Sequence, residues 1–289
     1  MLTSSWIKQL PLTAITQVTP VGGGDVNQAY RIDTATKPYF LLVQPGYPAD
    51  FYAGEIAGLK AFDEAQILAP RVIANGQIEG DGFLLLSFLT SGNGSQRDLG
   101  RLVAHLHQHH EPNGRFGFDY PYAGTSVSFT NTWTDSWADL SIHQRLDKLA
   151  AHLLKKGLWQ ADDEATFQQV RTIISKTLAH HHSDASLLHG DLWGGNYMFT
   201  ADGQPALIDP AAVYGDRELD IGVTTVFGGF TQDFYTAYQE VYPLDAGYHF
   251  RLDFYRLYYL MVHLDKFGMG YAGSVAAVMN QILDHGLAE

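Results

Sequence analysis

The sequence predicts a two-lobed α+β fold, in which a small antiparallel sheet precedes a larger, mainly helical lobe. Short apolar runs separated by turn residues fill residues 1–89, apart from one helical pattern at 49–65. Helical periodicity dominates residues 90–289. A stretch rich in Gly and Ser at 90–96 has the composition of a hinge. We therefore expect an N-lobe at 1–89 and a C-lobe at 90–289.

The elements of the N-lobe follow from local patterns. A short helix is expected at Trp6, because the apolar residues there have helical spacing and Pro11 interrupts them. Apolar runs on both sides of Gly22, Gly23 and Gly24 predict a strand, a glycine turn and a second strand. Further strands are expected at 39–43, 71–74 and 82–89.

The C-lobe shows a long aromatic loop at 114–137, of a kind that is more often a functional cover than an idle connection. Two short strands are expected around the 187–196 segment. Helices are expected at 99–109, 144–158, 164–181, 222–240, 248–267 and 274–287.

Composition excludes several classes of protein. The 289 residues are 46% hydrophobic, which supports a folded core, and they include no cysteine, which excludes disulfides and thiol chemistry. A net charge of −13 argues against general nucleic-acid binding. No apolar run is long enough to span a membrane, and no signal peptide is recognisable. We expect a cytoplasmic monomer or homodimer that binds neither nucleic acid nor membranes.

The most informative segment is residues 187–196, which read LLHGDLWGGN. Asp191 follows an apolar run, Asn196 lies five residues later, and Asp209 ends the next apolar run in ALIDP. This order is typical of the catalytic loop and metal-binding segment of kinases. Either triplet alone would be interpreted as a turn or a helix cap. Together they predict a site for phosphoryl transfer.

Phosphoryl transfer explains these residue types. The reaction needs a positioned hydroxyl, and it needs cations against the phosphoryl oxygens. Asp191 would hold the hydroxyl, while Asn196 and Asp209 supply the hard oxygen ligands that Mg²⁺ prefers. The glycines before Asp25 would let the backbone approach the phosphates of ATP, although by themselves they are equally consistent with a hairpin turn.

The chain resembles the fructosamine (ketosamine) kinases, which are related to the aminoglycoside and choline kinases and have a protein-kinase-like fold. The resemblance covers nearly the whole chain. It is carried by GGGDVNQAYRID at 22–33, GE at 54–55, FGFDY at 116–120, TWTDSW at 132–137, LLHGDLWGGN at 187–196, LIDPAAVYGDRELDIG at 207–222, FGGF at 227–230 and YRLYYLMVHLDKFG at 255–268. It implies ATP-dependent phosphorylation of the 3-hydroxyl of a ketosamine, a step of deglycation.

The resemblance also implies residue roles. Asp191 would be the catalytic base, and Asn196 and Asp209 would hold the metal. Nucleotide contacts would come from Gly22, Gly23, Gly24, Asp25, Glu55, Ser87, Phe88 and Leu89. Substrate contacts would come from Trp133, His189 and Trp193. We interpret the charged cluster Asp216, Arg217, Glu218 and Asp220 as an ion-pair network that braces the catalytic loop, in preference to a catalytic role.

One departure from the family pattern concerns the third strand. The family places a lysine there to pair with the helix glutamate, whereas this sequence has Leu42, so Glu55 is expected to lack its usual cation. Arg31 is the best substitute, because a turn centred near Ala35 puts it on the same sheet face as Leu42. Leu42 therefore leaves two hypotheses open, an active kinase with a substitute cation and a weakened or inactive one.

Three other functions compete with the ketosamine kinase. The first is a kinase for another hydroxylated amine, such as an aminoglycoside or choline. The second is a nucleotide-binding pseudokinase, for which Leu42 is the main support. The third is a non-enzymatic interaction protein, which would leave Asp191, Asn196 and Asp209 unexplained.

Overall fold

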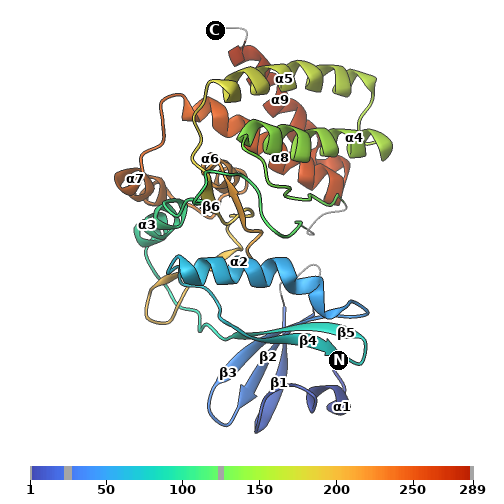
Figure 1. Cartoon of the computed structure of the whole chain (residues 1–289), viewed down its shortest axis with the longest axis vertical. Helices are drawn as coiled ribbons and strands as arrows, with labels where there is room; N and C mark the ends of the chain where they lie inside the picture. Colours follow the sequence, from blue (N-terminus) through green and yellow to red (C-terminus); the bar gives the residue numbers. More distant parts are fainter. Residues whose placement is uncertain (1, 23–27, 123–126, 287–289) are drawn as a thin grey trace. The chain divides into compact units, whose positions relative to one another are not determined.

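The computed structural model describes residues 2–22, 28–122 and 127–286. The chain forms two compact units (Figure 1). Unit 1 contains Met1–Gly94 and Met198–Asp209, and unit 2 contains Ser95–Tyr197 and Pro210–Glu289. The lobes predicted at 1–89 and 90–289 differ from these units mainly in the 198–209 segment.

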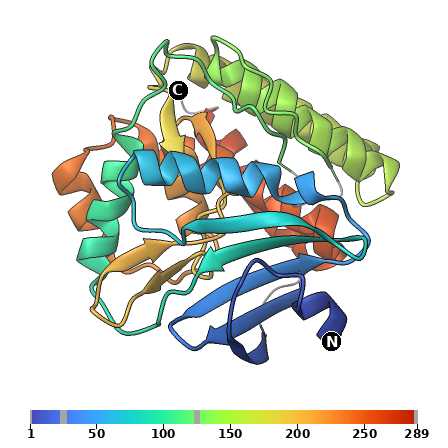
Figure 2. The same ribbon diagram turned by 60° about the horizontal axis from the view of Figure 1, so that its bottom comes forward.

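Unit 1 is built on a five-stranded antiparallel sheet with the strand order β1-β2-β3-β5-β4 (Figure 2). This sheet confirms the predicted α+β class. Its register pairs Leu42 with Ala29 on one side and with Leu84 on the other. The strands are β1 (Ile15–Val21), β2 (Gln28–Thr34), β3 (Pro38–Gln44), β4 (Val72–Ile78) and β5 (Asp81–Ser87).

The two faces of this sheet carry different helices. Leu41 and Val43 are buried on one face with Trp6 of α1 (Ser4–Ile7). Because side chains alternate along a strand, Leu42 lies on the opposite face. The 3₁₀-helix η1 (Ala49–Tyr52) and helix α2 (Ala53–Glu64) follow β3, and α2 runs across the sheet (Figures 1 and 2).

A second small sheet in unit 1 leads to Asp209. Strand β8 (Pro205–Leu207) pairs with β7 (Tyr197–Phe199), the strand at which the chain passes from unit 2 into unit 1. The backbone N–H of Leu207 donates a hydrogen bond of 2.9 Å to the carbonyl oxygen of Leu68. This bond ties the segment before Asp209 to the chain that follows α2.

Unit 2 is mainly helical, and α8 (Tyr248–Phe267) contributes more side chains to its core than any other described helix. Helices α5 and α9 lie side by side above α8 in Figure 1. The two-stranded sheet β6 (Ser186–Leu188) with β9 (Val213–Gly215) is antiparallel. The other helices are α3 (Gln96–His107), η2 (Asp139–Leu146), α4 (Asp147–Lys155), α5 (Ala161–Ala179), α6 (Glu218–Thr224), α7 (Gln232–Val241), η3 (Met269–Tyr271) and α9 (Ala272–Gly286).

The single helix predicted at 222–240 is wrong, because the structure has two helices there, α6 and α7. Gly228 and Gly229 interrupt the helical pattern with φ values of 79° and 89°. A Cβ on Gly229 would lie 2.8 Å from the Cα of Gly194. Glycine is therefore needed for the left-handed backbone and for the close approach of the two loops.

Among the described residues, no helix combines the length and apolarity needed to cross a lipid bilayer.

Candidate functional site

The loop at 189–196 begins directly after β6 and depends on a glycine. Gly190 has a φ of 82°, and a Cβ at this position would lie 2.0 Å from the carbonyl oxygen of Ala211. Only glycine allows both this backbone conformation and this approach. Gly190 thus fixes the direction in which the chain presents Asp191.

The carboxylate of Asp191 is held by two side chains of unit 2. The hydroxyl of Tyr259 donates to Oδ1 over 2.9 Å. The amide nitrogen of Asn196 donates to Oδ2 over 3.2 Å and to the backbone oxygen of Asp191 over 2.8 Å. Because Nδ2 of Asn196 donates these hydrogen bonds, the amide oxygen Oδ1 is the atom of this side chain that suits a cation. Both carboxylate oxygens of Asp191 are therefore fixed by hydrogen bonds.

Tyr259 was missed by sequence reasoning. It lies on α8, 68 residues after Asp191, and no spacing rule connects the two. The only signal was the YRLYYLMVHLDKFG segment that resembles the family.

The three predicted substrate residues have different environments. His189 is fully buried, and its Nδ1 accepts the backbone N–H of Asp191 over 3.3 Å. Because a fully buried ring presents no face to a ligand, we correct its role from substrate contact to positioning of Asp191. Trp193 is 42% exposed, so its ring can receive a ligand. Trp133 is half-buried and donates its indole N–H to Asp119 over 2.8 Å.

Asp220 braces the 189–196 loop from the buried face of α6. Its carboxylate accepts the backbone N–H groups of His189 at 2.7 Å and Gly190 at 2.9 Å. The same carboxylate lies 3.1 Å from Nε2 of His107. Burial lowers the pKa of His107. The ring is therefore neutral, donating from Nε2 and accepting from the hydroxyl of Tyr238 at Nδ1 over 2.8 Å.

Removing this brace should destabilise the protein. Asp220→Ala removes the acceptor of the buried N–H of His189 and of the half-buried N–H of Gly190, which costs about 3 kcal/mol of the free energy of unfolding. Urea unfolding measures the difference. Asp98→Ala is the control, because Asp98 is exposed and forms a surface ion pair with Arg101, and it should cost less than about 1 kcal/mol. Equal losses in the two variants would contradict the bracing role.

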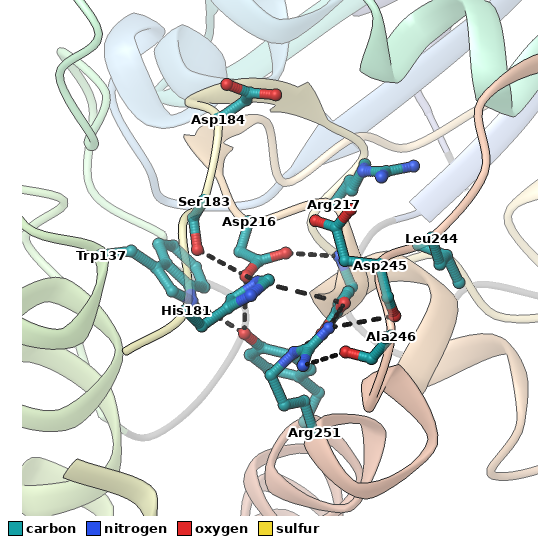
Figure 3. Close-up of polar contacts among 12 residues, drawn as sticks. Trp137, His181, Ser183, Asp184, Asp216, Arg217, Leu244, Asp245, Ala246 and Arg251 are labelled. Atoms are coloured by element: carbon teal, nitrogen blue, oxygen red, sulfur yellow. Dashed lines mark hydrogen bonds and ion pairs between the residues drawn. The ribbon is translucent and has the colours of Figure 1, made fainter. Parts of the chain in front are cut away.

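The other two carboxylates of the charged cluster, Asp216 and Glu218, have their own hydrogen-bond partners (Figure 3). Oδ2 of Asp216 accepts from Ser183 at 2.7 Å, His181 at 3.0 Å and the Tyr255 hydroxyl at 3.2 Å. Burial raises the pKa of Asp216, but the hydrogen bonds from His181 and Ser183 outweigh it and hold the pKa below its usual value. Nε and Nη2 of Arg251 donate to the two carboxylate oxygens of Glu218, at 2.8 and 2.7 Å.

This network could also be considered as a metal centre. One ligand atom from each of His181, Asp216 and Glu218 lies within 4.8 Å of the others, beside a cavity of about 20 Å³. However, Asp216 already accepts from three side chains, and Glu218 already has a cation in Arg251. A divalent ion would have to displace these partners. We therefore interpret the cluster as structural, as the sequence led us to expect.

In unit 1, the predicted nucleotide residues are partly outside the described chain. Gly23, Gly24 and Asp25 lie outside the described residues. Gly22 is described, and no atom lies within 4 Å of the position where its Cβ would be.

Arg31 lies on the same sheet face as Leu42, as the register predicted, because it pairs with Phe40 in the neighbouring strand. Its guanidinium donates to the carboxylate of Asp33 at 2.8 and 2.9 Å. It also stacks over the ring of Phe88, 4.7 Å from the ring centre. A role for Arg31 as the substitute phosphate cation stays a prediction, and in this structure its charge is shared with Asp33.

Glu55 lies near a second carboxylate of unit 1. Burial, followed by the charge of Asp209, raises the pKa of Glu55 to about 8. Among the described residues Glu55 has no ion pair, in agreement with the loss of the strand lysine at Leu42. Asp209 itself has a φ of 53°, a left-handed conformation that a non-glycine residue rarely adopts and that often marks a functional site.

The titration of Glu55 gives a pH-dependent stability. Its folded pKa of about 8 exceeds the ordinary value of 4.5, so between these values the folded state binds a proton that the unfolded state has lost. The free energy of unfolding of the metal-free protein should therefore fall as pH rises from 5 to 8, by up to about 1.4 kcal/mol per pH unit. Glu55→Gln removes this slope. Urea unfolding of both proteins at three pH values measures this slope. If the free energy of unfolding depends on pH equally in wild type and variant, Glu55 is not the cause.

The strand predicted to meet the adenine ends at Ser87. Ser87 exchanges hydrogen bonds with Arg71: its N–H donates to the Arg71 carbonyl at 2.8 Å, and its hydroxyl oxygen accepts the Arg71 N–H at 2.8 Å. Phe88 and Leu89 follow as half-buried, irregular chain. The backbone groups suited to a base are therefore those of Phe88 and Leu89 in preference to the N–H of Ser87.

Comparison with solved structures defines the class of protein as kinase-like. A putative fructosamine-3-kinase from Haemophilus somnus superposes with a TM-score of 0.82 at 28% identity, over 93% of this chain and 92% of that one. A thermostable mutant of aminoglycoside phosphotransferase APH(4)-Ia superposes with a TM-score of 0.60 at 14% identity, covering 95% of each chain, and shares the fold.

The sequence profile described as fructosamine kinase matches residues 1–285, and the chain belongs to this family. A probable ketoamine kinase from Staphylococcus aureus is 55% identical over 98% of both chains. The chloroplastic protein-ribulosamine 3-kinase of Arabidopsis thaliana is 32% identical over 94% of this chain and 84% of its own length. The protein is therefore a kinase, and the predicted family, fold and enzyme class are confirmed.

Proposed function

We propose that the protein transfers the γ-phosphoryl group of ATP to the 3-hydroxyl of a ketosamine. The observation that supports this most directly is the fixed carboxylate of Asp191, which accepts hydrogen bonds from the Tyr259 hydroxyl and the Asn196 amide. Such a carboxylate can orient a sugar hydroxyl and accept its proton as the phosphoryl group is transferred.

The remaining roles are assigned from the chemistry of the residues. The amide oxygen of Asn196 and the carboxylate of Asp209 are hard oxygen donors that fit Mg²⁺. When bound, Mg²⁺ neutralises charge on the phosphate oxygens. We assign phosphate contacts to Gly22, Gly23, Gly24 and Asp25, base contacts to Phe88 and Leu89, and a sugar contact to the exposed ring of Trp193.

Leu42 does not by itself argue for a pseudokinase. A degenerate site would have no need to retain Asp191, Asn196 and Asp209 with the loop geometry that Gly190 and Asp220 impose. We therefore propose an active enzyme, in which the absent strand lysine weakens nucleotide binding.

An ATP-consumption assay with a fructosyl amine tests the function. We expect ADP release that depends on the ketosamine, with the phosphate located on O3 of the product by NMR. Choline and an aminoglycoside serve as alternative acceptors. Preference for either acceptor, or no transfer to any of the three with Mg²⁺ or Mn²⁺, would refute the proposal.

A further inference from the structure

A group of aromatic side chains gathers beside Asp191 in unit 2. Its members, which we call the α8 aromatic cluster, are Phe227, Tyr259, His263, Phe267 and Tyr271. His263 lies at its centre, with ring centroids 4.5 Å from Tyr259, 4.7 Å from Phe227, 5.3 Å from Tyr271 and 5.4 Å from Phe267. The cluster joins the end of α8, the turn η3 and the loop between α6 and α7.

The outer side of this cluster is open to solvent. Phe227 is 46% exposed and Phe267 is 51% exposed. Met269, two residues beyond Phe267, is 61% exposed. Neighbouring exposed apolar side chains of this size often mark a binding surface. The inner side is buried, because Tyr259 is only 6% exposed.

The cluster is connected to the proposed reaction through Tyr259. Its hydroxyl lies 2.9 Å from Oδ1 of Asp191, the group proposed to hold the 3-hydroxyl. In a ketosamine the amine nitrogen is attached to C1, four covalent bonds from the oxygen on C3. Four bonds of about 1.5 Å span at most about 5 Å. The nitrogen must therefore lie close to Asp191, in the region that the Tyr259 side chain borders.

The chemistry of the cluster suits that nitrogen and its substituent. A ketosamine nitrogen is a secondary ammonium, and aromatic faces attract such cations. Nδ1 of His263 lies 2.9 Å from the backbone oxygen of Tyr259. A carbonyl oxygen can only accept, so Nδ1 carries the hydrogen. Burial lowers the pKa of His263, so Nε2 is an unprotonated acceptor for an ammonium N–H.

We propose that the α8 aromatic cluster is the amine subsite of the enzyme, and that it selects ketosamines whose nitrogen carries an aromatic or extended apolar group. The inference rests on the proposed function and adds the amine half of the substrate to it. The ammonium lies among Tyr259, His263 and Phe227, and the substituent extends over Phe267 and Met269.

Two substrates with the same sugar test the inference, N-methyl-fructosamine and N-benzyl-fructosamine. Both carry the same sugar and a secondary amine, and the benzyl compound adds an aromatic ring as apolar surface. We expect kcat/KM to be about tenfold higher or more for the benzyl compound, mainly through a lower KM. In the double variant Phe267→Ala, Met269→Ala the ratio of the two kcat/KM values should fall to within about threefold of unity.

The matched control is Tyr47→Ala, which removes an aromatic ring that is 46% exposed in unit 1. Its ratio should equal that of the wild type. If the double variant lowers both kcat/KM values equally, their ratio stays at the wild-type value. That result would indicate a structural defect alone, and it would overturn the inference. Equal use of both substrates by the wild type would also overturn it, while leaving ketosamine phosphorylation intact. No transfer to either substrate would instead refute the proposed function.

Discussion

Asp191→Asn is expected to reduce kcat for ketosamine phosphorylation by about 10³-fold or more. Asparagine has the same shape and still offers Oδ1 to the hydroxyl of Tyr259, but it cannot take the proton of the sugar hydroxyl. Nucleotide binding should change little, because Asp191 is assigned to the hydroxyl rather than to the phosphates. Steady-state kinetics and calorimetric titration with ATP measure the two effects separately.

The control for this variant is Asp98→Asn, at an exposed carboxylate of α3. It should retain the activity of the wild type. Full ketosamine kinase activity in Asp191→Asn would exclude Asp191 as the base. Loss of ATP affinity equal to the loss of kcat would move its role from the acceptor to the nucleotide.

Gly190→Ala is expected to lower the free energy of unfolding more than Gly→Ala at any other glycine of the 189–196 loop. Its Cβ would lie 2.0 Å from the carbonyl oxygen of Ala211, and its φ of 82° is unfavourable for alanine. Backbone strain alone costs about 1–2 kcal/mol. The collision adds a main-chain shift, so we expect a total loss of about 4 kcal/mol or failure to accumulate folded protein.

Gly80→Ala separates the two causes. Gly80 has a φ of 91°, but nothing lies within 4 Å of its Cβ position, so the variant has the strain without the collision. Thermal unfolding should show a clearly smaller decrease in Tm for Gly80→Ala. Equal decreases would mean that the approach to Ala211 does not constrain the loop.

Much of the fold was predictable because its signals are local. Strands β1 and β2, helix α2 and the 20-residue helix α8 each follow from periodicity and from glycine or proline residues that end the pattern. The break between α6 and α7 was missed because apolar periodicity continues across it. The need for glycine at Gly229 arises partly from a contact with Gly194, which lies more than 30 residues earlier in the chain.

The residue types of the site could be predicted from the sequence, but the hydrogen bonds that hold those residues in place could not. Spacing identified Asp191 and Asn196, but the hydrogen bond from Tyr259 depends on how α8 packs against the loop. Arg31 illustrates the same limit. Strand register placed it on the correct face, yet its guanidinium binds Asp33 through a contact two residues away along its own strand. Rotamers and tertiary packing decide such contacts, and sequence spacing does not encode them.

The most direct measurement is a crystal structure of the complex with Mn²⁺ and a non-hydrolysable ATP analogue, in which anomalous scattering locates the ion. We expect Mn²⁺ about 2.1 Å from the amide oxygen of Asn196 and from the carboxylate of Asp209, beside the phosphates and next to Asp191. Carboxylates of Asp191 and Asp209 that face separate cavities, or an ion bound instead among His181, Asp216 and Glu218, would contradict the proposed mechanism.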